Sequence, residues 1–151
     1  MKWRVFTIIS ILLLPFFTGC NIAAGSYPYA AVYEIKTKEE DLIKAIQDFK
    51  RDNPEFNVPG QLQISDGRDT SDLNSLWYHV YFYYPQEKQI INTWTRPSNS
   101  GGTSFAFVGV NEGIVLGNWK EINKDFNSAG NKEVKKKFEE RIVSKVIAYL
   151  H

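Results

Sequence analysis

Two residue types that often carry chemistry are almost absent from this chain. Cys20 is the only cysteine, and the small residues Thr18 and Gly19 precede it. His79 is the only histidine before the C-terminal His151. A lone cysteine cannot form an internal disulfide, so another role is expected for its thiol. A tetrahedral zinc site needs four nitrogen, sulfur or oxygen ligands, so this composition argues against one and we expect no metal.

The first residues have the pattern of a secretory signal. Lys2 and Arg4 precede an apolar stretch from residue 5 to residue 17 that contains no acidic residue. This order is typical of segments that direct export through a membrane. The stretch has about 13 residues, whereas a helix needs roughly 20 to span the hydrocarbon core. We therefore interpret it as a signal rather than as a permanent membrane span.

The end of this stretch, Phe17-Thr18-Gly19-Cys20, resembles the lipobox of bacterial lipoproteins. Phe17 stands where Leu is more usual, but it is also bulky and apolar. The resemblance implies cleavage before Cys20, a diacylglyceryl group on its thiol and acylation of the new amine. Two or more acyl chains hold a protein stably on a bilayer, whereas one holds it weakly. The implied organisation is a signal peptide over residues 1–19, a lipidated tether over 20–25 and one α+β domain over 26–151.

The same resemblance implies a location in the cell envelope. Asn21 follows the cysteine where many lipoproteins of the inner membrane have Asp, so the outer membrane is favoured. The segment from Trp77 to Trp94 and residues 117–120 make the body similar to small uncharacterised envelope lipoproteins of the Bacteroidota type. No activity comes with that similarity, and no cofactor is expected beyond the covalent lipid on Cys20.

Charge and size restrict the possible partners. Of the 18 basic residues, Lys2 and Arg4 lie in the first 19 residues, which leaves 16 basic against 17 acidic residues. A chain without a basic excess is not expected to bind nucleic acid. The remaining length, about 130 residues, suffices for one domain with its own core.

Hydrophobic periodicity predicts an α+β fold, an antiparallel sheet of about five strands with two helices packed on one face. Thr37 and Glu40 have the spacing of a capping box at the start of the first helix, which Asn53-Pro54 would end. The second helix is expected from about Asn131 to the C-terminus. Strand candidates cover residues 27–35, 61–64, 76–84, 89–96, 105–110 and 114–116.

The two longest strand candidates form a predicted hairpin. Pairing Tyr84 with Gln89 would place on one sheet face the side chains of Trp77, His79, Tyr81, Trp94 and Arg96. Such an aromatic face could stack on sugar rings, on a peptide or on the anchor residues of another protein. The competing interpretation, favoured because large aromatics usually lie where area is buried, is that this face packs against the helices with His79 hydrogen-bonded and inert.

Catalytic and metal-binding motifs are weak. The chain has no Gly-x-Ser-x-Gly elbow, and Cys20 would carry lipid, so a hydrolase using His79 is a lesser alternative. Residues 66–72 are rich in carboxylates, but Arg68 stands at a ligand position of a calcium loop, so a solvated turn is expected.

We therefore expect a membrane-anchored envelope lipoprotein without enzymatic activity that binds a protein or glycan partner through one sheet face. A periplasmic immunity or enzyme-inhibitor lipoprotein is the second hypothesis, because a small tethered domain can occlude an active site.

Overall fold

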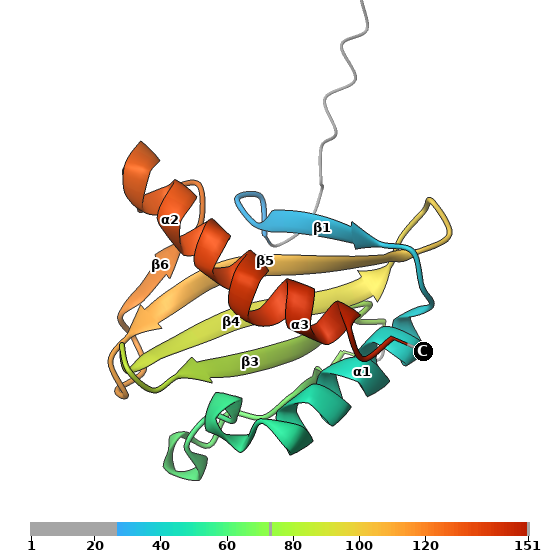
Figure 1. Ribbon diagram of the computed structural model, residues 1–151, viewed down its shortest axis with the longest axis horizontal. Coiled ribbons are helices and arrows are strands. Elements are labelled where there is room, and N and C mark those ends of the chain that lie inside the picture. Colours follow the sequence, from blue (N-terminus) through green and yellow to red (C-terminus); the bar gives the residue numbers. More distant parts are fainter. Residues whose placement is uncertain (1–26, 73, 151) are drawn as a thin grey trace, which may run out of the picture.

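The computed structural model describes residues 27–72 and 74–150 (Figure 1). The predicted signal peptide, Cys20 and the tether lie outside these residues. The strands are β1 Ala31–Ile35, β2 Gly67–Arg68, β3 Tyr78–Tyr84, β4 Gln89–Pro97, β5 Thr103–Glu112 and β6 Trp119–Glu121. The helices are α1 Glu39–Asp52, α2 Ser128–Phe138 and α3 Ser144–Ile147, with a π-helical turn over Glu139–Val143 between the last two and two 3₁₀ turns over Pro54–Phe56 and Gly60–Leu62.

All six strands form one sheet, and every pair in it is antiparallel. The order is β1-β5-β4-β3-β2, and β6 pairs with β5 on the edge that β1 also occupies. The predicted α+β class is confirmed. The predicted hairpin register is confirmed too, because Tyr84 pairs with Gln89 and His79 with Trp94.

A bulge in β5 changes which side chains share a face. Thr93 pairs with Phe107 and Asn92 with Gly109, so Val108 is an extra residue without a partner on β4. One extra residue shifts the alternation of side chains along the rest of the strand. Val110 therefore joins Ile91 in the large core, and Asn111 lies on the opposite face beside Ile90.

The start of α1 differs from the prediction. The N-cap is Lys38, and no side chain caps the helix, so the capping box from Thr37 to Glu40 is wrong. Thr37 instead accepts a hydrogen bond at its backbone oxygen from Thr103 Oγ1, at 2.8 Å, which fixes it to β5. The end of the helix is as predicted, since Asn53 Nδ2 donates to the Phe49 carbonyl at 2.8 Å.

Four other predicted elements are corrected. The first strand begins at residue 31, because residues 27–30 form a turn in which the Ala30 amide donates to the Tyr27 carbonyl. Residues 61–64 contain the end of a 3₁₀ turn rather than a strand, and residues 114–116 form a loop before β6. The second helix begins at Ser128, because the Asn127 side chain accepts from the Gly130 amide and caps it.

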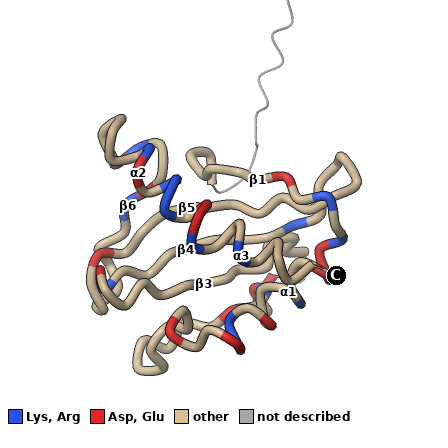
Figure 2. The backbone as a smooth tube through the Cα atoms, viewed as in Figure 1, with Lys and Arg blue, Asp and Glu red and all other residues tan. Residues whose placement is uncertain are grey.

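Buried side chains form two separate clusters. The large cluster contains α1 residues such as Leu42 and Phe49, residues of β3, β4 and β5, and Phe138 and Val146 from the C-terminal helical segment. Its centre is Phe138, whose ring stacks on Phe107 at 4.5 Å between centroids. The small cluster contains Trp94, Ala106 and Val108, covered by Tyr27, Ala30 and Trp77, and includes no helix residue. Charged residues lie mainly on the helices and turns, and the central strands carry few (Figure 2).

Candidate functional site

The aromatic face, meaning Trp77, His79, Tyr81, Trp94 and Arg96, is built by the register of four strands. Pairing across the sheet aligns Val32 of β1, Ala106 of β5, Trp94 of β4 and His79 of β3 in one row. Trp94 and Ala106 belong to the small cluster, which has no helix residue. The interpretation that these aromatics pack beneath the helices is therefore wrong.

Tyr27 covers the centre of this face. Its ring lies 6.0 Å from Trp77 and 5.9 Å from His79 in edge-to-face geometry, and 6.1 Å from Trp94. Aromatic pairs at these separations attract one another beyond the area that they bury. The sequence placed Tyr27 in a strand, so its role here was not predicted. Pro28, a residue that favours turns, is the sequence signal that could have indicated a turn at Tyr27 instead of a strand.

Trp94 is the most buried member of the face. It is 4% exposed, and its indole Nε1 is buried without a hydrogen-bond partner among the described residues. The Arg96 guanidinium lies over its ring, 5.4 Å from the centroid. His79 Nδ1 and Asn92 Oδ1, on the same face, are also buried without a partner in residues 27–72 and 74–150. Buried polar atoms are normally paired, so three unpaired atoms on one face mark it as exceptional.

His79 is half-buried and lies between two tyrosines. Its ring is stacked 6.5 Å from Tyr81 and meets the edge of Tyr27. Burial lowers the pKa of His79, and the charge of Asp69 opposes that shift. Burial also raises the pKa of the Tyr27 and Tyr81 hydroxyls. At neutral pH the ring is therefore uncharged, and the expectation of an internally hydrogen-bonded histidine does not hold for Nδ1.

The hollow beside Tyr27 is small. It has a volume of about 60 Å³ and is lined by Val32, Trp77, Trp94 and Arg96 together with the Tyr27–Ala30 turn. Pockets that enclose small ligands usually measure about 300–1,000 Å³. Trp77, His79, Tyr81 and Arg96 are nevertheless all partly exposed. The face is thus suited to shallow contact with a surface rather than to enclosing a small molecule.

The carboxylates of residues 66–72 have partners within the protein. Asp66 Oδ2 pairs with Lys50 Nζ at 2.5 Å, and Asp66 Oδ1 accepts from the Tyr81 amide at 2.9 Å. Asp69 and Asp72 accept from backbone amides two residues further on, as in Asx turns. Among the residues that the structure describes, no group of three or more His, Cys, Asp or Glu side chains could hold a metal ion.

No protein-family model, curated protein or solved structure matches this chain. Within residues 27–72 and 74–150, no helix is long and apolar enough to cross a membrane.

The loop between β5 and β6 is a second unusual surface, and the sequence prediction missed it. Ile114, Val115, Leu116 and Trp119 are all exposed, with Val115 at 70%. The run of apolar residues was interpreted as a strand. An exposed apolar loop was not expected, because its backbone is satisfied by the nearby Asn111 side chain rather than by a neighbouring strand.

Proposed function

We propose that this chain is a lipid-anchored envelope protein, attached through Cys20, that binds a partner protein through its aromatic face and has no enzymatic activity of its own. The Phe17–Cys20 segment supports the anchor by its resemblance to a lipobox. In this proposal both helices cover one face of the sheet and leave the aromatic face for the partner.

The observation that carries the binding proposal is the composition and exposure of the aromatic face. Trp, Tyr and Arg are the residues most enriched at the energetic centres of protein interfaces. Trp77, Tyr81 and Arg96 lie partly exposed around Trp94, which fixes the centre of the patch. Because the hollow of about 60 Å³ is too small to enclose a sugar ring, a protein surface fits better than a buried glycan.

Two separate measurements test the two halves of this proposal. Intact mass of protein purified from the producing bacterium should show loss of residues 1–19 and the added mass of a diacylglyceryl group and an acyl chain. Cys20→Ser should remove that mass and release the protein from the membrane fraction. An unmodified Cys20 in the membrane fraction would contradict the anchor.

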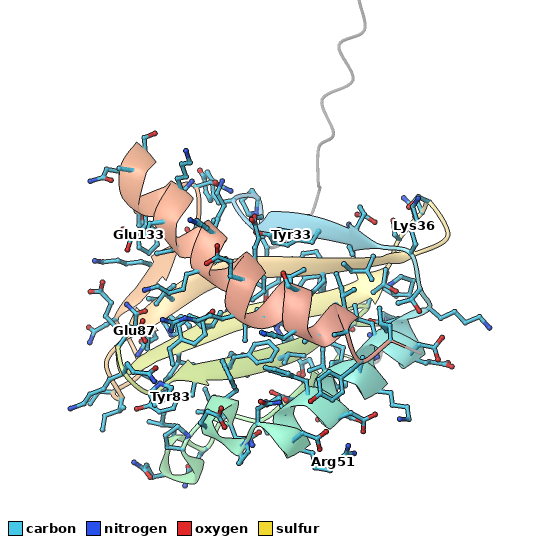
Figure 3. All side chains as sticks on the ribbon, viewed as in Figure 1. Tyr33, Lys36, Arg51, Tyr83, Glu87 and Glu133 are labelled. Carbon is cyan, nitrogen blue, oxygen red and sulfur yellow. The ribbon has the colours of Figure 1, made fainter. Side chains whose placement is uncertain are left out.

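The partner is sought by affinity purification from detergent-solubilised envelopes. We expect Trp77→Ala and Arg96→Ala each to weaken recovery of the partner by at least about tenfold, the loss of 1.4 kcal/mol that marks an interface centre. Arg51→Ala is the matched control, because Arg51 lies on α1 (Figure 3) and pairs only with its neighbours Asp48 and Asp52. Equal recovery with all three variants, or recovery of glycan alone, would overturn the proposal.

A further inference from the structure

The β5–β6 loop, residues 113–118, presents apolar side chains at its tip and has no charged residue. With Trp119, the first residue of β6, its sequence is Gly-Ile-Val-Leu-Gly-Asn-Trp. Ile114 is 42% exposed, Leu116 39% and Trp119 38%, around the more exposed Val115. Scattered single hydrophobic residues are normal on a surface, but a contiguous exposed group indicates an interaction site.

The loop is held in this conformation by the buried side chain of Asn111. Asn111 Nδ2 donates to the carbonyls of Gly113 and Val115, at 3.0 and 2.9 Å. Asn111 Oδ1 accepts from the amides of Gly117 and Asn118, at 3.1 and 2.9 Å. All four bonding positions of the amide are used, and Asn111 is 0% exposed. The satisfied backbone means that the exposed apolar tip is a built feature rather than a frayed strand.

The segment after the loop carries no excess of positive charge. Lys120 pairs with Glu112 at 2.7 Å beside the loop, and Lys124 pairs with Glu121. An aliphatic tip with a tryptophan beside it follows the order found at a membrane interface. There aliphatic side chains enter the hydrocarbon region, while tryptophan lies at the level of the headgroups.

We propose that the β5–β6 loop docks onto the surface of the bilayer to which the protein is anchored, with Ile114, Val115 and Leu116 inserted among the lipid chains. This inference rests on the membrane attachment in the proposed function. Protein interfaces rarely use Leu and Val at their energetic centres, so the aliphatic tip favours lipid over a protein pocket. The anchor also keeps the domain near the bilayer, because the seven steps from Cys20 to Tyr27 span at most roughly 25 Å.

The test measures the depth of the loop in a bilayer. The chain lipidated at Cys20, whose own thiol is blocked by the lipid, carries one added cysteine, Val115→Cys, labelled with an environment-sensitive fluorophore. It is reconstituted through its lipid anchor into vesicles of phosphatidylcholine and phosphatidylglycerol. We expect a blue shift of emission and quenching by lipids that carry a nitroxide on the acyl chain. Asn99→Cys is the matched control, since Asn99 is exposed in the β4–β5 turn at the opposite end of the sheet, and it should show neither change.

Each outcome bears on a different part of the inference. A chain that does not float with the vesicles contradicts both the attachment and the docking. A chain that floats with equal emission at positions 115 and 99 overturns the docking alone. A shift at position 115 that appears only when envelope proteins are added would assign the loop to a protein pocket and also overturn it. Thermal unfolding of both labelled chains, compared with the unlabelled chain, establishes that the fold is unchanged.

Discussion

Individual polar atoms show where the aromatic face departs from ordinary packing. Trp94 Nε1 and His79 Nδ1 are buried without partners, although leaving a buried polar group unpaired costs about 1–3 kcal/mol. The contacts of Tyr27 with both rings offset part of this cost. We expect the unpaired polar atoms on this face to serve a function, and contact with a binding partner would supply one.

The titration of His79 gives a prediction for a single residue. Burial lowers its folded-state pKa below the ordinary value of 6.5, so the unfolded chain takes up the proton first as the pH falls. The free energy of unfolding is therefore highest above pH 6.5 and decreases as the pH falls through 6.5 towards the folded-state pKa. Urea unfolding between about pH 8 and pH 5.5 measures this slope, and His79→Gln should reduce it.

Carboxylates with a lowered pKa add a separate dependence on acid, and Glu87 is one of them. Burial raises its pKa, but hydrogen bonds from Arg141 and Lys137 outweigh this and lower the pKa below 4.5, so its contribution is lost only at more acidic pH. An unchanged slope in His79→Gln would show that His79 titrates alike in the folded and unfolded states.

Individual elements differ in how far the sequence predicted them. The β3–β4 hairpin was predictable, because Phe82 and Val80 alternate with Tyr81 and His79 and only one register buries the apolar set. The bulge at Val108 was not, since residues 105–110 are apolar or glycine throughout and satisfy either face.

The surroundings of the candidate site were predicted only in part. The five residues of the aromatic face follow from the hairpin register. The cover by Tyr27 depends on contacts with residues distant in sequence, which no local pattern encodes. The loop held by Asn111 depends on local hydrogen bonds, but they come from a side chain that replaces a partner strand, which hydrophobic periodicity does not reveal.

The segment between α1 and β3 is fixed at the sheet edge by Asp66, which gives a prediction at the scale of elements. Asp66 binds Lys50 and the Tyr81 amide, and Lys50 Nζ also donates to the Tyr81 carbonyl at 2.9 Å. Asp66→Ala would leave the buried Lys50 ammonium without its counter-charge, and we expect a loss of about 2–4 kcal/mol in urea unfolding. Asp72→Ala, at an exposed Asx turn, should cost no more than about 0.5 kcal/mol. Equal losses in the two variants would contradict this role for Asp66.

At the scale of the whole molecule, the sheet separates two clusters that are expected to contribute differently. The large cluster joins both helical segments to three strands around Phe138, which contacts Phe105 and Phe107. The small cluster has three buried residues and a cover that begins at Tyr27. Global stability should therefore depend on the large cluster, while the small one controls access to the aromatic face.

One pair of variants tests this division. Phe138→Ala removes a fully buried ring and should cost about 3–5 kcal/mol, measured by urea unfolding. Tyr27→Ala removes a half-exposed cover, so we expect only about 1 kcal/mol together with faster exchange of the Trp94 indole proton in NMR spectra. In Phe138→Ala the exchange rate of the Trp94 indole proton should increase only by the factor that the lower free energy of global unfolding accounts for. If Tyr27→Ala costs as much as Phe138→Ala, or leaves the indole exchange unchanged, Tyr27 does not act as a local cover.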